Sequence, residues 1–425
     1  CTKKPKLWPF DAHRNSIMNV DRSLFFFVAA MDKFPFFRPD VAVLFGKEMC
    51  RRGHSMQWLA QSEATSYKSY NTKWECCRVR VIGIDAGNGL MAKLRKQWFA
   101  MRMEMELIRI LLTPRRFDFV QVKDKFVGGF IALLICRLRG MKMTFWLSYP
   151  FPESYLNDAK HASLLNSAFY YLKGKLFWFL LYHIIMPFSD HNFVQSEQMK
   201  RDVVSNGVDG KAMTVVPMGI DRDKIEMVGI EPAPSDEPPT VIFTGVFFKV
   251  RRLDFVIRVF DLVRQEIPVA RFFMIGAGKD DQDDRLINDE IVRLGLEDAV
   301  ELPGFVPFDV MLDYVRRADL CLSPYYPSFL LNSTSPTKLI EYMAMGKAVV
   351  ANDHPEQRLI LEESGGGLCV PYDERAFADA IVELLRDPQR CVEMGRKGQA
   401  YVLAHRTYDV IADKVEQIYY NVLDR

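Results

Sequence analysis

The sequence lacks a hydrophobic run long enough to cross a bilayer. Its longest apolar stretches, residues 126–136 and 176–188, are shorter than the roughly 20 residues that a transmembrane helix needs. No secretory signal is recognisable near the N-terminal end. These absences predict a cytoplasmic protein, and they leave open a peripheral contact with the inner face of the cytoplasmic membrane.

Cysteine and histidine are few and are not spaced as metal ligands. The eight cysteines include no CxxC pair, and none of the seven histidines is paired at ligand spacing. We therefore expect a reduced chain without a disulfide framework and without a metal site. The acidic run at 280–284 is best explained as a polar loop that leads into a helix.

Several familiar catalytic and nucleotide-binding motifs are also missing. The sequence contains no GxxxxGK[ST] loop, no GxGxxG opening a helix after the first strand, no HExxH and no GxSxG. Their absence argues against the chemistries that these motifs support.

The net charge is small overall but is unevenly distributed along the chain. Of the 425 residues, 1–220 hold 32 Lys and Arg against 18 Asp and Glu, a net charge of +14. Residues 221–425 hold 24 against 36, a net charge of −12. A basic half predicts an anionic partner, either nucleic acid or an anionic membrane surface. Alternatively, the opposite charges help two domains to face each other. No nucleic-acid recognition motif is present, so we expect no nucleic-acid partner.

Short apolar runs alternate with amphipathic helical segments in both halves, as in parallel sheets covered by helices on both faces. We expect an α/β protein of two doubly wound αβα domains that face a cleft. The predicted boundaries are 1–220 for the first domain and 221–404 for the second, with a Pro-rich linker at 229–239. Residues 160–186 are predicted to be helical and very apolar.

The segment 332–352 contains the sharpest candidate site. Ser335 is a suitable N-cap, Pro336 suits the first helical position, and Gly346 suits the end of the helix. Such a helix start binds phosphate through its free N–H groups, and Lys338 would add a positive charge. Glu341 could accept hydrogen bonds from ribose hydroxyls. The alternative is a capped surface helix with a Lys338–Glu341 ion pair.

A basic turn at 244–252 is the second candidate. It follows a predicted strand, and Lys249, Arg251 and Arg252 could neutralise a diphosphate leaving group. The alternative is a solvated basic turn. Gly276 and Gly278 also follow a strand, but a lone GxG mostly indicates a tight turn.

Taken in order, these segments resemble a known family. VVPMGIDRDK, FTGVFFKVRRLDFVIRVF, MIGAGKDDQ, VELPGFVP, DLCLSP and SPTKLIEYMAMGKAVVA are similar to the family 4 retaining glycosyltransferases of the GT-B fold, chiefly over 190–420. The resemblance implies that the second domain binds a nucleotide-sugar donor and the first binds the acceptor. It also implies that a final helix, about 405–425, crosses back to the first domain, and that no metal or other cofactor is needed.

The resemblance also assigns roles to individual residues. Glu341 resembles the second glutamate of the family's E-x7-E signature, and Lys249 and Arg251 resemble its basic catalytic pair, with Arg252 as another possible match. The residues that would line the donor are Gly245, Arg252, Gly304, Phe305, Val306, Ser335, Pro336, Thr337, Lys338, Leu339 and Glu341.

Three positions depart from the family pattern. Ser333 stands where the first signature glutamate would fall, which removes that contact to the sugar. Ser148 replaces a histidine that often follows the strand at 142–147, and the segment 30–39 has no glycine-rich loop.

The resemblance implies retaining transfer of a hexose from a UDP- or GDP-linked donor to a glycan or lipid-linked precursor. The alternatives are a nucleotide-sugar epimerase of the same fold and a non-catalytic nucleotide-sugar-binding protein. The basic first half and the basic, aromatic stretch that begins at 173–175 suit an anionic bilayer. A buried core helix is the alternative for that stretch.

Overall fold

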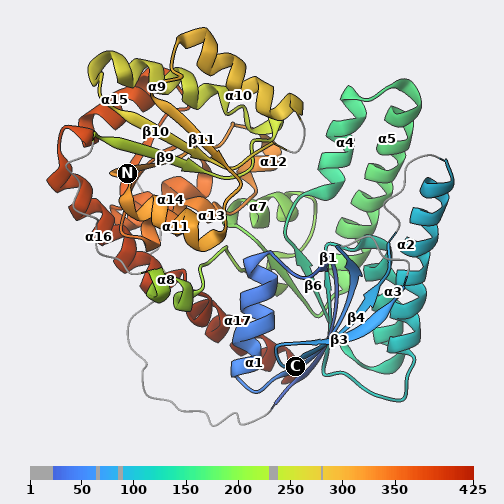
Figure 1. Cartoon of the computed structure of the whole chain (residues 1–425). Helices are drawn as coiled ribbons and strands as arrows, with labels where there is room; N and C mark the ends of the chain where they lie inside the picture. Colours follow the sequence, from blue (N-terminus) through green and yellow to red (C-terminus); the bar gives the residue numbers. More distant parts are fainter. Residues whose placement is uncertain (1–22, 64–67, 85–89, 229–237, 279–280) are drawn as a thin grey trace, which may run out of the picture.

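The computed structural model describes residues 23–63, 68–84, 90–228, 238–278 and 281–425. Within these residues the chain forms two sheets, each flanked by helices, that lie next to each other (Figure 1). Together with a returning C-terminal helix, the two sheets confirm the predicted fold class. Most of the linker predicted at 229–239 lies outside the described residues.

The first sheet has the order β3-β4-β2-β1-β5-β6-β7-β8, and its strands are parallel except for β3, which pairs antiparallel with β4. Its strands are β1 (Phe25–Phe34), β2 (Ser55–Ser62), β3 (Tyr70–Trp74), β4 (Cys77–Ile82), β5 (Phe119–Lys123), β6 (Lys142–Leu147), β7 (His191–Val194) and β8 (Met213–Val215). The sequence did not predict β3. This edge strand, YNTKW, has no apolar run because its residues are exposed or only half-buried.

The helices of this half cover both faces of the sheet (Figure 1). They are η1 (Asp40–Glu48), α1 (Met49–Arg51), α2 (Leu90–Leu111), α3 (Phe126–Arg139), α4 (Phe151–His161), α5 (Leu164–Phe179), η2 (Leu180–Ile185), α6 (Met186–Phe188), α7 (Glu197–Ser205) and η3 (Gly210–Ala212). The short helix α8 (Arg222–Val228) follows and places Ile225 in a core cluster of the second half (Figure 1).

The prediction that residues 160–186 are helical is confirmed except at a turn of two residues. Extended backbone at Ala162 and Ser163 ends α4 and lets α5 begin, so the chain folds into a helical hairpin that projects from the first half (Figure 1). The apolar sequence hides this turn because both sides of it are rich in Leu, Phe and Tyr. The hairpin also leaves part of α5 open to solvent, with Leu172 at 68% and Leu176 at 52% exposed.

The second sheet is entirely parallel, with the order β11-β10-β9-β12-β13-β14. Its strands are β9 (Thr240–Thr244), β10 (Arg271–Ile275), β11 (Val300–Gly304), β12 (Leu320–Ser323), β13 (Ala348–Asn352) and β14 (Gly367–Val370). Its helices are η4 (Lys249–Arg251), α9 (Asp254–Glu266), α10 (Asp281–Leu294), α11 (Phe308–Arg317), α12 (Phe329–Asn332), α13 (Thr337–Ala344), α14 (Pro355–Ser364), α15 (Glu374–Leu385) and α16 (Pro388–His405).

The last helix, α17 (Tyr408–Leu423), returns to the first sheet, as predicted (Figure 1). The backbone of Thr407, just before it, forms an isolated parallel bridge with Ile220. Tyr419 then packs edge-on against Phe26 and Phe119 of the central strands. The returning helix therefore completes one of the two hydrophobic clusters of the first sheet.

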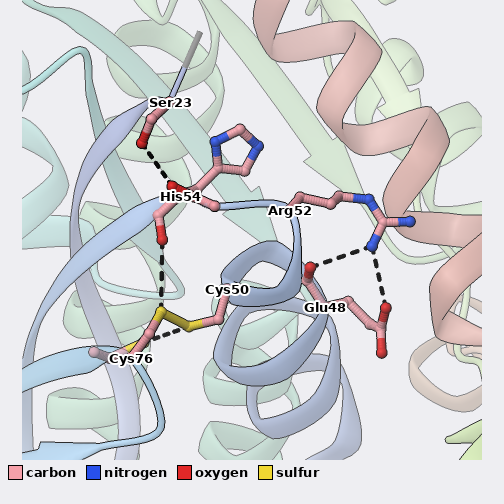
Figure 2. The surroundings of a disulfide bond; sticks show 8 residues. Ser23, Glu48, Cys50, Arg52, His54 and Cys76 are labelled. Atoms are coloured by element: carbon pink, nitrogen blue, oxygen red, sulfur yellow. Dashed lines mark hydrogen bonds and ion pairs between the residues drawn. A yellow bond between two sulfur atoms is a disulfide. The ribbon is translucent and has the colours of Figure 1, made fainter. Parts of the chain in front are cut away.

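The structure corrects the prediction of a fully reduced chain. A disulfide joins Cys50, at the end of the helix that follows β1, to Cys76, in the tight turn between β3 and β4 (Figure 2). The two Cα atoms lie 5.8 Å apart although 26 positions separate them in sequence. The pairing could not be expected without β3, because the β3–β4 turn is what brings Cys76 to the helix.

Candidate active site

Helix α13 begins at the carboxyl edge of the second sheet, and its start differs in detail from the prediction. Pro336, not Ser335, occupies the N-cap position, and no side chain caps the helix. Ser335 is buried and its Oγ donates to Glu356 at 3.0 Å and accepts from the Met218 N–H at 3.0 Å. The first-turn N–H groups of α13 are thus left without a side-chain cap, as an anion site requires.

Two glycine loops pack closely at this edge. Gly245, after β9, has a φ of +143° and its backbone runs directly beneath the side chain of Lys338, where a Cβ would collide. Gly276, after β10, has a φ of +142° and lies against the carbonyl oxygen of Gly245. Gly276 N–H in turn donates to the Gly304 carbonyl at 2.9 Å. Glycine is needed at 276 because the backbone of Gly245 approaches too closely for a side chain, and both positions have a positive φ that other residues rarely adopt.

Lys338 and Glu341 occupy the predicted positions on α13 but do not form the alternative ion pair. Within the described part of the chain, neither side chain has a hydrogen-bond or salt-bridge partner. Burial lowers the pKa of Lys338, and the nearby Arg251 lowers it further, against the opposing effect of Glu341. Burial raises the pKa of Glu341, against Lys338 and Lys224. Both groups therefore lack hydrogen bonds from the described residues, and a bound ligand could supply them.

The basic turn separates its three cations. Arg252 has a φ of +50° and its exposed guanidinium pairs with Asp254 at 3.2 Å. Arg251 has no such partner within the described residues, and its charge acts on Lys338. Lys249 is exposed, and only its backbone N–H is held, by Asp283 at 2.8 Å. Arg251 thus acts electrostatically on Lys338, whereas Arg252 is paired with Asp254.

The remaining predicted donor residues fall into two groups. Gly304, Val306 and Thr337 are half-buried at the same edge, and Phe305 is 79% exposed. Leu339 is fully buried in the core behind α13, so its side chain cannot touch a ligand. Only the backbone of Leu339 could take part in binding.

Ser333 faces the first half of the molecule. It is 1% exposed, its Oγ donates to Asp202 of α7 at 2.5 Å, and its carbonyl accepts from Ser196 Oγ at 2.7 Å. The residue at the position of the first signature glutamate therefore joins the two halves.

A buried ion pair supports the start of α13 and was not foreseen. Arg406 Nη1 lies 2.9 Å from Glu356 Oε1, which also accepts from Ser335. Burial raises the pKa of Glu356, and Arg406 is the main opposing influence. Glu356 and Arg406 lie 50 positions apart, so no local pattern in the sequence could have identified the pair.

Charged residues also gather at the carboxyl edge of the first sheet. Asp124, after β5, is in the left-handed region with a φ of +58° and accepts from Ser148 Oγ at 2.5 Å. Arg38 donates to the same Oγ at 3.1 Å and also binds Asp40. Burial raises the pKa of Asp124, while Lys123 opposes that shift. Ser148 therefore belongs to a polar network at the position where the family often has histidine.

The two edges lie within electrostatic reach of each other. Burial is the main cause of the raised pKa of Tyr149, and Arg251 from the other half opposes it. Burial also raises the pKa of Tyr408, on which Asp40, Arg38 and Glu341 all act. An uncapped helix start, two cations and an unpaired carboxylate thus lie opposite a polar edge, an arrangement that can hold a diphosphate beside a second substrate.

Solved structures of similar fold define the class of protein. Sucrose-phosphate synthase from Thermosynechococcus elongatus superposes with a TM-score of 0.68 at 17% identity, over 95% of this chain and 100% of that one. The HepE protein of Anabaena, solved in complex with UDP, superposes with a TM-score of 0.65 at 14% identity, over 94% and 100%. The fold is that of the GT-B glycosyltransferases.

Family models identify the chain more closely. The model described as Glycosyltransferase Family 4 matches residues 41–224, and the model described as Glycosyl transferases group 1 matches residues 238–387. The chain therefore belongs to the glycosyltransferases described as family 4 or group 1, and it is a glycosyltransferase. The phosphatidyl-myo-inositol mannosyltransferase of Mycolicibacterium smegmatis is 24% identical over 218 residues, 50% of this chain and 53% of that protein. The match thus spans about half the length of that relative.

Proposed function

We propose that this glycosyltransferase moves a hexose, with retention of its anomeric configuration, from a UDP- or GDP-linked donor to an acceptor hydroxyl. The donor's diphosphate lies at the start of α13, and its ribose is held by Glu341. The reaction uses no metal ion or other cofactor, because protein cations take the place of a metal at the diphosphate. The similarity to a protein solved with UDP supports a nucleotide donor.

The observation that carries this proposal is the unsatisfied state of Lys338 and Glu341. Both side chains are half-buried. A partly desolvated ammonium group with a lowered pKa gains from a multiply charged anion. A partly desolvated carboxylate without hydrogen bonds from the protein gains from hydroxyl donors. A nucleoside diphosphate carries both kinds of group.

The proposed chemistry is a substitution at the anomeric carbon. The bond between this carbon and the diphosphate oxygen breaks while the acceptor hydroxyl attacks from the same face. Negative charge grows on the leaving diphosphate, where the N–H groups near Thr337, Lys338, Arg251 and Lys249 stabilise it. No side-chain nucleophile is required.

We propose that the acceptor is a lipid-linked or glycan precursor, bound at the polar edge formed by Arg38, Asp124 and Ser148. The exposed apolar side of α5, with Lys175 beside Tyr171 and Trp178, supports contact with an anionic bilayer. The protein would then work at the inner face of the cytoplasmic membrane. No helix among the described segments is long and apolar enough to cross a membrane.

A thermal-shift screen of nucleoside diphosphates and their sugars tests the proposal. A ligand that binds only the folded protein stabilises it, by about 2.7 kcal/mol at a concentration 100 times its Kd. We expect uridine or guanosine diphosphates to raise the Tm of the parent protein, and to raise that of Lys338→Gln much less. No shift with any nucleotide would contradict the proposal.

Product analysis with the stabilising donor separates transfer from the two alternatives. A transferase releases nucleoside diphosphate faster when an acceptor is present and leaves the new sugar with its original anomeric configuration. An epimerase would change the sugar without needing acceptor, and a binding protein would bind donor without turnover. Activity that persists in a chelator would support the metal-free mechanism.

A further inference from the structure

A basic pocket lies at the outer edge of the first sheet, away from the candidate active site. Its volume is about 630 Å³, and none of its lining residues belongs to the donor or acceptor edges. The floor comes from β2, β3 and β4, through Gln57, Asn71, Lys73, Arg78 and Arg80. One wall comes from α2, through Glu106, Arg109 and Ile110.

The pocket holds four cations and one carboxylate. Glu106 pairs with Arg109 at 2.6 Å and with Arg80 at 3.0 Å, and these two arginines keep its pKa below the usual range. The single carboxylate is thus fully engaged. Lys73 and Arg78 have no acidic partner in the part of the chain that the structure describes. The lining carries a net charge of +3, which favours an anionic occupant.

The two unpaired cations are placed against each other. In the antiparallel ladder between β3 and β4, Lys73 lies directly opposite Arg78, so both side chains emerge on the same face of the sheet. Like charges directly opposite each other destabilise a strand pair. The pair becomes favourable once an anion lies between the two side chains.

Helix α2, which forms one wall of the pocket, also carries a strip of exposed apolar side chains. Trp98, Met101 and Met105 of α2, and Leu112 just after it, follow one another at spacings of three or more residues along the helix and are 45–60% exposed. Arg109, which lines the pocket, fits the same strip, three residues before Leu112 and four after Met105. Helical residues at these spacings share one face. A basic pocket therefore opens beside an exposed strip of large apolar side chains.

We propose that this pocket binds the phosphate of an anionic phospholipid while the α2 strip enters the interfacial layer of the bilayer. Residues 90–188, which contain α2, α3 and α5, hold 15 Lys and Arg against 6 Asp and Glu, a net charge of +9 that complements an anionic surface. A free phosphate would satisfy the pocket but not the strip. This inference does not rest on the proposed sugar transfer, because it needs neither donor nor acceptor.

Vesicle binding by the full-length protein tests the proposal. We compare the parent chain with Lys73→Gln/Arg78→Gln on phosphatidylcholine vesicles with and without phosphatidylglycerol at low salt. Each cation near an anionic surface contributes about a fivefold gain in affinity, so the double variant should bind roughly 20- to 30-fold more weakly. Lys211→Gln is the control, because it removes an exposed cation from the far side of the same sheet. Its affinity for the vesicles should differ from that of the parent by less than about fivefold.

A second pair of measurements separates the lipid from a soluble anion. Met101→Ser/Met105→Ser should weaken vesicle binding and leave the binding of inorganic phosphate unchanged. The Tm of the charge variant should equal or exceed that of the parent, because a repulsive pair is removed, so weak binding cannot be ascribed to unfolding. Equal vesicle binding by parent and charge variant would overturn the proposal. Binding of inorganic phosphate without binding of vesicles would overturn the bilayer as its source.

Discussion

Two adjacent arginines, Arg251 and Arg252, have different surroundings in this protein. The guanidinium of Arg252 pairs with Asp254, whereas Arg251 acts on Lys338. The sequence offered both residues as matches to the family's basic pair. It could not choose between them, because the choice depends on a left-handed turn at Arg252 and on a partner two residues later.

The first prediction concerns catalysis by this turn. Replacing Arg251 or Lys249 with Ala should lower kcat by about 10²–10³-fold for each charge that stabilises the leaving diphosphate. Arg252→Ala is the matched control and should retain most of the activity, because its guanidinium is held by Asp254. Steady-state kinetics with a saturating donor measures the effect. Unchanged turnover in both Lys249→Ala and Arg251→Ala would reject the role.

The second prediction concerns pH. A bound diphosphate favours the protonated form of Lys338, so binding takes up a proton wherever the free side chain is neutral. Burial lowers the pKa of Lys338. Donor affinity should therefore fall as the pH rises through that lowered pKa, by at most about 10-fold per pH unit. Calorimetric titration of parent and Lys338→Gln checks this, and equal slopes for the two proteins would refute it.

At the scale of elements, most helices and strands could be predicted because each buries one continuous apolar face. The strand at 142–147 has the predicted bounds, and the final helix expected at about 405–425 spans 408–423. The failures share a cause: β3 and the α4–α5 turn are set by tertiary neighbours and have weak or misleading local patterns. In the candidate site, too, residues with a local sequence pattern could be predicted and contacts between distant residues could not. Lys338 and Glu341 were visible in the helix pattern, whereas the Ser335–Glu356 contact was not.

A third prediction addresses the support beneath α13. In Glu356→Gln, Arg406 remains buried without its countercharge, and removing one partner of a buried ion pair typically costs about 3–5 kcal/mol. Denaturant unfolding of parent and variant measures the loss. Glu363→Gln, on the same helix but at an exposed position, is the control. A loss no greater than that of the control would show that the pair contributes little.

A fourth prediction addresses the Cys50–Cys76 bond, which links the end of α1 to the β3–β4 turn. Opening a loop of this size should cost about 2–4 kcal/mol, since the cross-link restricts the unfolded chain. Cys76→Ser should therefore unfold at lower denaturant than the oxidised parent. Cys391, which is buried and takes no part in the disulfide, offers a control. A Cys391→Ser variant keeps the disulfide, so a reducing agent should lower its stability by the same amount as it lowers that of the parent. Equal stability of oxidised parent and Cys76→Ser would contradict the prediction.

At the scale of the whole molecule, the two halves are connected by several independent contacts. The Ile220–Thr407 bridge, the return of α17 and the Ser333–Asp202 hydrogen bond all cross between them. These contacts hold the start of α13 opposite the polar edge of the first sheet. The two-sheet design was predictable from the repeated rhythm of apolar runs, but the contacts between the sheets were not, because they join distant residues.

The central claim is that the start of α13 accepts the donor's diphosphate. The most direct measurement is a crystal structure of the full chain soaked with the nucleotide that raises its Tm most. The account predicts density for both phosphates at the N–H groups near Thr337, within reach of Lys338 and Arg251, and for the ribose at Glu341. A nucleotide bound elsewhere, with this helix start empty, would contradict the account.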